Sequence, residues 1–494
     1  MGVSLYTSRV ILNALGVEDY GIYNVVGGVV AMASVITGSL GASCSRFITF
    51  AQGKEDLEHQ IKVFSTSVNI LIILALLILI VGETIGIWFL NTEMNIPEER
   101  LNAAFWVLQF SIFTFVVNLL SVPYNAAIIA HEDMKVFATA SIFDVLLKLA
   151  AALSLFAIIN YDKLIIYALL MFLAGIVMRI YYGVYCKRHY KECVYKLVND
   201  RPLLREMLDF AGWSFVGCSA QTFITQGVNI IVNLFFGVAA NAARGVAVQV
   251  EHALRQFVNS FMTALDPRIT KSFAQGETDY VLKLVYYGAK YAYFLAFFFA
   301  LPLIVEAEFV LGIWLKDVPE FTVLFVRWTA LVVLAEVLSL TMLRANAASG
   351  KIRKYQLVVG GVNMTIFPIS WLCFHFGMSA VASYIVHFIV YFINIFVRIR
   401  MMRGILPITY KDFISKVFAK VVPVSLLAAT PMLFLSMYME DSWIRFGIVG
   451  CTTVIVLPLA IYWLGLSVHE RLYAISTVKK FYNDRIKRVV GTSK

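Results

Sequence analysis

The chain has 494 residues, of which 60% are hydrophobic and 15% are charged, and its mean hydropathy is +0.79. This composition excludes an ordinary soluble protein, because a soluble chain of this length needs far less apolar surface. The net charge of +10 would be high enough for a nucleic-acid-binding protein, but the placement of the basic residues indicates membrane topology instead.

Apolar segments follow one another almost from end to end. A hydrocarbon core of about 30 Å needs about 20 apolar residues per helix. We therefore predict an all-α polytopic membrane protein with about 14 transmembrane helices, the first of them truncated. The predicted spans are a partial one at 1–15 and full ones at 21–48, 63–90, 101–122, 136–160, 164–185, 208–236, 241–268, 280–315, 321–343, 355–376, 379–401, 417–439 and 443–466.

Lys and Arg residues concentrate in every second loop. The basic loops are 46–62, 187–205, 268–283, 344–354 and 398–420, followed by the tail 471–494. The intervening loops hold only Arg100, Lys163, Lys316 and Arg445, mixed with acidic residues. By the positive-inside rule, this pattern places the basic loops and the C-terminus in the cytoplasm, facing anionic lipids.

Three short sequences recur about half the chain length apart. Arg46-Phe47-Ile48-Thr49-Phe50-Ala51-Gln52-Gly53 returns as Arg268-Ile269-Thr270-Lys271-Ser272-Phe273-Ala274-Gln275-Gly276, Gly86-Ile87-Trp88 as Gly312-Ile313-Trp314, and Leu15-Gly16-Val17 as Phe236-Gly237-Val238. Duplicated membrane halves are typical of transporters. Because the seventh span begins at 208, the offset of 221 places the start of the first helix at −13, so we expect the natural protein to start upstream of Met1.

Each half contains an even number of helices, so both halves enter the membrane in the same orientation. We predict a six-helix N-terminal lobe at 1–185, a basic cytoplasmic linker at 186–207 and a six-helix C-terminal lobe at 208–401. Two extra helices at 402–466 and a basic tail at 467–494 follow. In the linker, apolar residues recur at helical spacing between the charges, which favours an interfacial helix.

Charged residues at mid-membrane depth are costly and are therefore functional candidates. In the span 241–268, Arg244, Glu251, Arg255 and Asn259 share one helical face. This face can line a polar cavity. Alternatively, Glu251 and Arg255, spaced i, i+4, form a self-neutralising pair that helps the helix insert.

The span 208–236 carries an uncharged polar stripe. Gln221, Thr225, Asn229 and Asn233 recur every four residues, which keeps them near one helical face. We favour a wall facing a lumen, and hydrogen bonding between helices is the alternative.

The first half carries fewer candidates. Asp144 and Lys148 are spaced i, i+4 at the centre of the span 136–160, where a neutralising pair is the stronger interpretation. Arg46 heads the repeated motif but lies near the cytoplasmic end, where its side chain can reach the interface. Further charged residues within spans are Arg179, Lys290, Arg327 and Glu336.

No constellation typical of an enzyme stands out. The chain lacks HExxH, GxSxG with triad partners, a P-loop, and GxGxxG after a strand. We therefore predict that it is not an enzyme and uses no cofactor or metal, and that an ion or substrate gradient supplies any energy. His131-Glu132-Asp133, in a short loop, is interpreted as a solvated turn and not as a metal site.

The segment Leu15-Gly16-Val17-Glu18-Asp19-Tyr20-Gly21-Ile22-Tyr23-Asn24 resembles the segment after the first helix of Wzx-type polysaccharide flippases. These belong to the multidrug/oligosaccharidyl-lipid/polysaccharide (MOP) exporter superfamily. The twofold six-helix plan, the Phe-Ala-Gln-Gly turn and the two trailing helices are similar to the same family.

The resemblance implies a V-shaped pair of lobes around a central cavity. It also implies translocation of an undecaprenyl-pyrophosphate-linked oligosaccharide across the bacterial inner membrane, by alternating access, for surface polysaccharide (O-antigen, capsule or exopolysaccharide) biosynthesis. The implied partners are this lipid-linked oligosaccharide, anionic lipids, and the polysaccharide polymerase and chain-length machinery, with no nucleic acid.

Such a substrate requires a polar, cationic passage, and arginine binds phosphate with paired hydrogen bonds. Arg255 and Arg244 are therefore the leading candidates for the pyrophosphate, with Gln221, Thr225 and Asn229 facing the sugars. One alternative is a cation-coupled multidrug exporter of the same superfamily, which would use acidic and aromatic groups where this stripe has two arginines to one glutamate. Another is a membrane polysaccharide polymerase or ligase, which would need a larger periplasmic loop than this sequence offers.

The predicted topology can be tested directly. A reporter that is active only in the periplasm, fused after residue 494, is expected to stay silent, whereas a reporter active in the cytoplasm is expected to work at the same position. The opposite pattern would overturn the topology.

Overall fold

The computed structural model describes residues 34–92, 96–158, 161–198, 200–315 and 318–472, together with residues 7, 10, 11, 13–16, 19–23, 26 and 476. These residues form helices, turns and short connections, without a strand among them. The all-α prediction is therefore confirmed. Most of the predicted partial span 1–15, the first part of the span 21–48 and the end of the basic tail lie outside the described residues.

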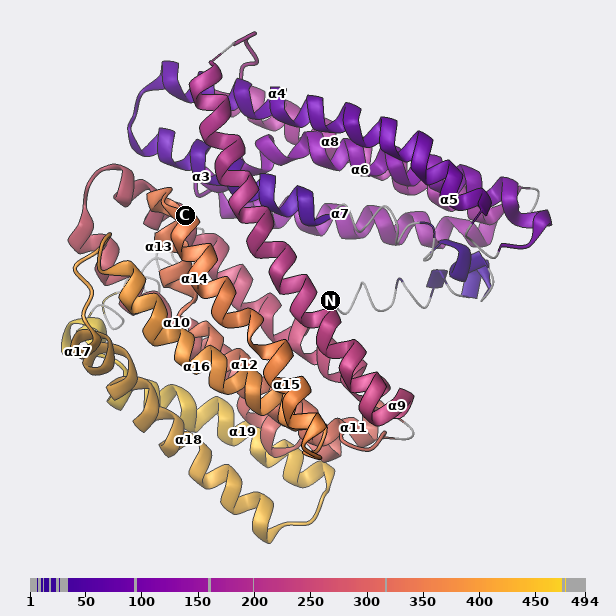
Figure 1. Cartoon of the computed structure of the whole chain (residues 1–494). Coiled ribbons are helices and arrows are strands. Elements are labelled where there is room, and N and C mark those ends of the chain that lie inside the picture. The colour runs from indigo at the N-terminus through magenta and orange to yellow at the C-terminus, as the bar shows by residue number, and fades with distance from the viewer. Residues whose placement is uncertain are drawn as a thin grey trace, which may run out of the picture. The chain divides into compact units, whose positions relative to one another are not determined.

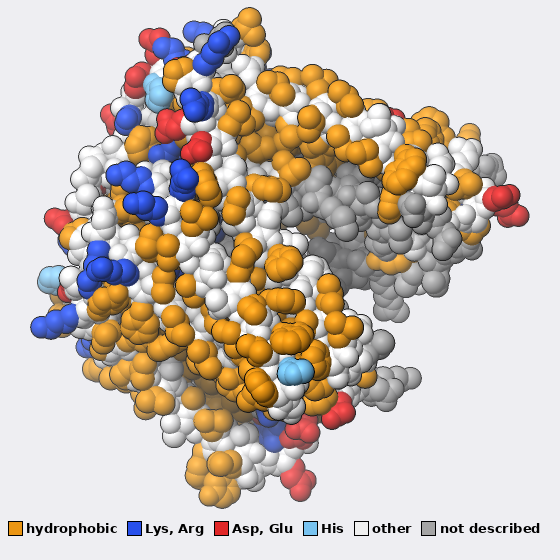
Figure 2. Space-filling view, viewed as in Figure 1, with side chains coloured by type: hydrophobic (Ala, Val, Ile, Leu, Met, Phe, Trp, Pro, Cys, Tyr) orange, Lys and Arg blue, Asp and Glu red, His pale blue; other side chains and the backbone are white. Residues whose placement is uncertain are grey.

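Eleven helices among the described residues are long and apolar enough to cross a membrane. They are Leu57–Thr92, Glu98–Ala130, Met134–Ala157, Lys163–His189, Arg201–Gly237, Thr278–Val305, Thr322–Ser349, Ile352–His375, Ala382–Met402, Tyr410–Tyr438 and Trp443–Gly465. Each coincides with a span predicted from the sequence. Figure 2 shows hydrophobic side chains over much of the visible surface.

The predicted span 241–268 is helical but is not among these apolar helices. Arg244, Glu251 and Arg255 make it too polar. A helix of this composition is costly next to lipid, and therefore faces protein or water.

The first half of the chain is built around α6 (Leu101–Ala130), which packs against α3 (Ser34–Gly53), α4 (Leu57–Val81) and α8 (Lys163–His189) (Figure 1). Helix α4 continues through a π-helical turn at Gly82–Gly86 into α5 (Ile87–Thr92), and α7 (Met134–Ser154) packs against α8. Phe64, Leu119 and Ile128 lie fully buried in the core of this half.

Aspartate side chains begin three of these helices. Asp56, Asp133 and Asp162 accept hydrogen bonds from the first backbone N–H groups of α4, α7 and α8, which otherwise lack partners. Asp162 also binds Arg100 at 2.6 Å, and the same guanidinium donates to Asp19 at 2.9 and 2.5 Å. This clamp ties the segment that resembles the flippases to the start of α6 and of α8.

Helix α9 (Arg201–Ala274) is interrupted at Gly237, whose φ is 75°. Gly237 repeats Gly16, and Gly16 has a φ of 84°. Both values lie in the left-handed region that glycine adopts without steric cost. The repeat found in the sequence therefore coincides with a positive φ at the same position in both halves.

The second half continues with α10 (Thr278–Val305), α11 (Ala307–Trp314), α12 (Thr322–Val337), α13 (Leu340–Ser349), α14 (Ile352–Met364), α15 (Ile366–His375) and α16 (Ala382–Met402). The span predicted as 280–315 is thus two helices, α10 and α11. The break falls at Glu306, four residues after Pro302, which lies within α10.

Two extra helices follow, as predicted. After α17 (Tyr410–Phe413) and a π-helical turn at Ile414–Phe418 come α18 (Ala419–Tyr438) and α19 (Trp443–Ala460), which ends in a π-helical turn at Ile461–Gly465. The two helices pack against each other and against α10.

By its contacts the chain forms two compact units. The first comprises Met1–Ala220, Asp266–Glu277 and Ala347–Gln356, and the second Gln221–Leu265, Thr278–Asn346 and Leu357–Lys494. Two short segments from the second half of the sequence therefore belong to the first unit. The six-plus-six division at 186–207 stays a prediction.

The prediction of an interfacial helix in the linker is wrong. Residues 190–198 form a turn followed by irregular backbone. This segment is bound to α4 instead. Tyr195 donates to Asn69 at 2.8 Å, and the backbone N–H of Lys196 donates to Ser65 at 3.1 Å. Asn69 also donates to the backbone carbonyl of Val198 at 3.3 Å. Polar side chains of α4 therefore satisfy part of the linker backbone in place of helical hydrogen bonds.

Two buried ion pairs attach the C-terminal helices to α10 and α11. Arg445 binds Glu306 at 2.8 Å, with only 6% and 0% of the two side chains exposed. Lys290 binds Glu470 at 2.7 Å, and the hydroxyl of Tyr291 donates to the same carboxylate. Burial alone would raise the pKa of Glu470, but the hydrogen bonds from Lys290 and Tyr291 hold this pKa below its usual range.

The Arg445–Glu306 pair gives a prediction for stability. Arg445→Ala leaves the Glu306 carboxylate buried without its cation and should cost about 3–5 kcal/mol, measured by thermal unfolding of the purified protein in detergent. Arg445→Gln with Glu306→Gln should recover part of this loss. The control is Lys416→Ala, because Lys416 and Asp412 form an exposed pair that contributes at most about 1 kcal/mol. Equal losses for both single variants would contradict the prediction.

Candidate functional site

The most unusual group of side chains in the second unit is centred on Arg255 of α9. Its guanidinium donates to Glu251, one helical turn earlier, at 2.8 and 2.9 Å, and also to Glu336 of α12. Between 18% and 28% of each of these three side chains is exposed. The i, i+4 pair expected from the sequence is therefore one half of a carboxylate–arginine–carboxylate triad.

Arg244 is more deeply enclosed, with 4% of the residue exposed. Its Nε donates to the side-chain oxygen of Asn229, and its guanidinium lies 5.4 Å from the ring centroid of Tyr384 on α16. Asn229 in turn donates to Gln226 at 3.1 Å. Because Asn229 precedes the bend at Gly237 and Arg244 follows it, this contact braces the two parts of α9 against each other.

The uncharged stripe is also engaged by protein partners. Gln221 donates to the hydroxyl of Tyr391 at 3.3 Å, and Thr225 donates to the backbone carbonyl of Gln221 at 3.0 Å. Asn233, at the end of the stripe, is exposed. Hydrogen bonding between helices therefore accounts for Gln221, and the lumen-facing wall stays a prediction.

Counting Glu336 changes the charge of the site. The two arginines, Arg244 and Arg255, are matched in number by two carboxylates, Glu251 and Glu336, so the four formal charges sum to zero. The excess of arginine inferred from the stripe alone is therefore absent. The sequence did contain one sign that Glu336 belongs to a polar site, because a carboxylate inside an apolar span requires a cation nearby. The sequence does not show which cation lies next to it.

The exposed side of α9 carries a second set of polar residues, all uncharged or histidine. They are Gln249, His252, Gln256, Asn259 and Ser260, which we call the exposed polar face. Gln249, His252, Gln256 and Asn259 follow one another at intervals of three or four residues, and Ser260 is four residues after Gln256, which places all five along one side of the helix. Asn259, one helical turn after Arg255, is exposed and lies where the arginine stripe borders this face.

The remaining candidates lie in the first compact unit. Asp144 and Lys148 bind each other at 2.6 Å on α7, with side chains 30% and 44% exposed, as a self-neutralising pair would. Arg46 does not reach the solvent, because its side chain is only 9% exposed. Its guanidinium lies 4.3 to 5.6 Å from the ring centroids of Phe47, Phe50 and Phe210.

The turn His131-Glu132-Asp133 is also more than a solvated turn. His131 forms a hydrogen bond with the buried Glu192 and stacks on Tyr190, while Asp133 accepts a bond from Tyr185 at 2.7 Å. Burial alone would raise the pKa of Glu192, but the hydrogen bond with His131 holds this pKa below its usual range. Over the part of the chain that the structure describes, no cluster suited to a metal ion occurs.

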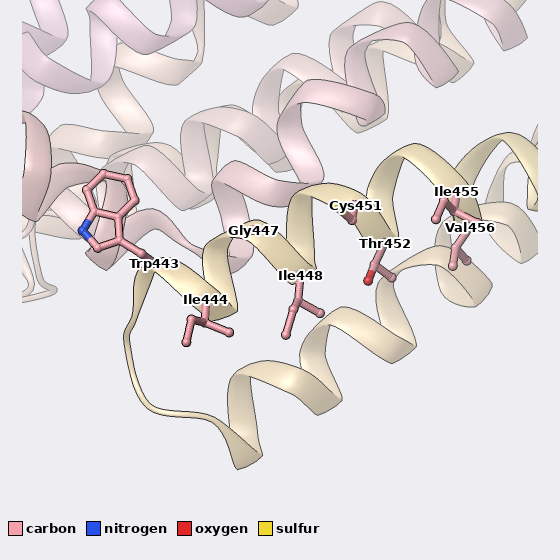
Figure 3. Close-up of a pocket in the computed structure, with 8 residues that line it drawn as sticks. All are labelled: Trp443, Ile444, Gly447, Ile448, Cys451, Thr452, Ile455 and Val456. Atoms are coloured by element: carbon pink, nitrogen blue, oxygen red, sulfur yellow. The ribbon is translucent and has the colours of Figure 1, made fainter.

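An apolar groove of about 400 Å³ runs along α19 and is lined by Trp443, Ile444, Gly447, Ile448, Cys451, Thr452, Ile455 and Val456 (Figure 3). Trp443, Ile444 and Ile455 are more than half exposed. An outward apolar surface on a predicted membrane helix is what contact with lipid requires, so we assign it no part in the polar site.

Comparisons with known proteins agree with this architecture. A family described as "Polysaccharide biosynthesis protein" matches residues 1–273, more than half of the chain. The chain belongs to this family.

One relative is the "Uncharacterized membrane protein EpsK" of Bacillus subtilis (strain 168). It is 23% identical over 281 residues, which are 56% of this chain and 55% of that protein. The chain therefore aligns with about half the length of this relative.

Solved structures with the same fold include a MOP superfamily transporter from Pyrococcus furiosus Vc1 and a multidrug resistance MATE family transporter of the same superfamily in an outward-facing conformation. Each has a TM-score of 0.72, is 13% identical, and is matched over 82% of this chain and 92% of its own. At this identity the likeness shows the fold alone. With the family, it confirms the resemblance to Wzx-type members of the MOP superfamily.

The triad gives a second prediction. Arg255→Ala leaves Glu251 and Glu336 facing each other without a cation. The expected loss of stability is about 2–3 kcal/mol, below that of a fully buried pair because these side chains keep some solvent contact. Gln256→Ala, on the exposed polar face of the same helix, should change stability by no more than about 0.5 kcal/mol. Thermal unfolding in detergent measures both, and indistinguishable curves would contradict the triad.

Proposed function

We propose that this protein is an exporter that moves an undecaprenyl-pyrophosphate-linked oligosaccharide from the cytoplasmic to the periplasmic leaflet for surface polysaccharide biosynthesis. The observation that carries the proposal is the combination of the polysaccharide biosynthesis family with a MOP transporter fold. The protein then acts as a transporter, not as an enzyme. It lies in the bacterial inner membrane with its C-terminus in the cytoplasm, and the polysaccharide polymerase and chain-length machinery are its downstream partners.

Helix α9 offers the polar surface that a sugar needs. The exposed polar face presents amide, hydroxyl and imidazole groups, which donate and accept hydrogen bonds without a fixed charge. A neutral surface of this kind suits the hydroxyl groups of an oligosaccharide better than hydrocarbon does. We place the saccharide along Gln249, His252, Gln256 and Asn259. Its contacts continue to Gln221, Thr225 and Asn229, which lie earlier in α9, before the break at Gly237.

The pyrophosphate requires a cation, and Arg255 and Arg244 remain the proposed ligands. Arg255 is already bound by two carboxylates. A pyrophosphate at Arg255 would therefore compete with these two carboxylates for the guanidinium. Substrate binding is then linked to a rearrangement of the triad between α9 and α12, a link that a permanently vacant arginine would not provide.

A cation-coupled multidrug exporter of the same superfamily is the second candidate. The balance of charges at the site favours this candidate more than the sequence suggested, because Glu251 and Glu336 both lie near Tyr391, and Glu336 also lies near His387. Acidic and aromatic groups of this kind bind organic cations. The two candidates differ in the charge of the substrate, so a transport assay separates them.

The proposed substrate can be tested by depletion of the protein, followed by mass spectrometry of the lipid extract. We expect accumulation of an undecaprenyl-pyrophosphate-linked saccharide, and its return to normal when the protein is restored. An unchanged lipid-linked saccharide pool, together with normal surface polysaccharide, would contradict the proposal.

Substitutions at the triad test its role in the same cells. Arg255→Gln with Glu251→Gln and Glu336→Gln removes every charge of the triad but keeps polar side chains, so the membrane helices are not left with an isolated charge. If Arg255 binds the pyrophosphate, this variant is expected to insert normally and to fail in export. Arg255→Lys should retain part of the activity, because lysine keeps the charge and loses the planar fork. Normal export by the uncharged variant would show that the triad is structural.

A further inference from the structure

The two copies of the repeated motif, 46–53 at the end of α3 and 268–276 at the end of α9, lie against each other within the first compact unit. A Cβ atom built on Gly53 would lie 2.9 Å from the Cα atom of Lys271 and 3.0 Å from the Cβ atom of Ala274. Two backbones approach this closely only where one residue lacks a side chain. The glycine of the first motif is therefore needed for its contact with the second motif.

The arginine that begins each motif reaches a turn of the opposite half. Arg268 donates to Glu132 at 3.1 Å, joined by Lys271 at 3.3 Å. Glu132 lies in the turn between α6 and α7 and has a φ of 57°. Arg46 lies so close to Gly350, in the turn between α13 and α14, that a Cβ there would be 2.5 Å from its Nη2. Gly350 has a φ of 77°.

These two turns occupy corresponding positions in the two halves. Residues 132 and 350 differ by 218, close to the offsets of 222 and 223 between the motifs, and both residues adopt a left-handed backbone conformation. The contacts are thus related by the internal repeat. They differ in chemistry, because Glu132 supplies a carboxylate where Gly350 supplies only a close backbone surface.

We propose that the two copies of the motif form a latch that closes, in this conformation, the end of the transporter that carries the basic loops. We call Glu132, Arg268 and Lys271 its ionic part and Gly53 its packing part. The latch must open for a substrate to enter from that end, so this inference rests on the proposed export function.

The ionic part has the weakness that a reversible contact requires. The side chains of Arg268, Lys271 and Glu132 are 60%, 23% and 30% exposed. Water competes for such pairs, and their net contribution is small. The Arg445–Glu306 pair, at 6% and 0% exposed, is by contrast suited to a permanent attachment. The first contact can therefore break during a transport cycle in which the second stays intact.

The test measures the distance between spin labels on Lys54 and Glu277, which directly follow the two motifs and are both exposed. The labels are carried by cysteines at these positions, after the exposed Cys218 and Cys451 have been replaced by serine. Pulsed electron–electron double resonance on the reconstituted protein gives the populations with short and long distances between the two spin labels. We expect a short-distance population to dominate when Glu132 is intact.

Glu132→Lys should lower the ratio of short to long distances roughly fivefold, the size expected for losing a partly exposed ion-pair network. Adding Arg268→Glu and Lys271→Glu restores opposite charges and should restore the ratio. Glu58→Lys makes the same charge change in an exposed pair of the same unit and should leave the ratio unchanged. An unchanged ratio for Glu132→Lys, or no recovery in the reversed combination, would overturn the ionic part.

Gly53→Ala tests the packing part independently of charge. The added methyl group meets backbone atoms of α9, so the two motifs must separate and the long-distance population should grow. Gly38→Ala adds the same group to the same helix where nothing lies within 4 Å, and should leave the ratio unchanged. If Gly53→Ala also leaves the ratio unchanged, the motifs do not form a latch.

The distance measurement needs no knowledge of the substrate. If the distances respond to the substitutions as expected but the protein does not export lipid-linked saccharides, the proposed function is refuted and the latch is supported. Normal export with no response of the distances would refute the latch alone.

Discussion

The structure depends on the pairing of charges within an apolar protein. A charge in hydrocarbon is costly unless a partner of opposite sign lies close to it, and helices that share such a pair are held in a defined register. Glu306 and Arg445 join the break after α10 to the start of α19, and Lys290 and Glu470 join the middle of α10 to the end of that helix pair. Arg255 joins α9 to α12 in the same way. Ion pairs therefore hold helices together where apolar packing alone would give little orientation.

The solvent exposure of each ion pair corresponds to the role that we infer for it. The most enclosed pairs attach the two additional helices, and we regard them as permanent. The triad at Arg255 is partly open to solvent, and a phosphate can compete there with a carboxylate. The pairs at Glu132 are the most exposed of the three groups, in keeping with a contact that opens and closes. One type of interaction thus serves attachment, binding and switching, depending on how far water reaches it.

Much of the fold could be predicted from the sequence, because the bilayer imposes a strong pattern. Among the described residues each predicted apolar span is helical, although the span 280–315 is divided into two helices. The glycines of the repeat, Gly16 and Gly237, both have a positive φ. The predictions that failed involved polar contacts between segments distant in sequence. Helical spacing in the linker could not show that Tyr195 and Lys196 find partners on α4, and a lone Glu336 could not identify Arg255. Arg46, expected at the interface, is enclosed by aromatic rings from two helices.

The central claim is that this member of the polysaccharide biosynthesis family moves a lipid-linked saccharide between the leaflets of a membrane. The most direct measurement uses proteoliposomes that contain the purified protein and an undecaprenyl-pyrophosphate-linked oligosaccharide placed in one leaflet. An impermeant enzyme that cleaves the saccharide then reports its appearance in the other leaflet. The account predicts rapid appearance with this protein and little with the variant that lacks the triad charges. Appearance no faster than in protein-free liposomes, together with uptake of an organic cation by the same vesicles, would contradict it.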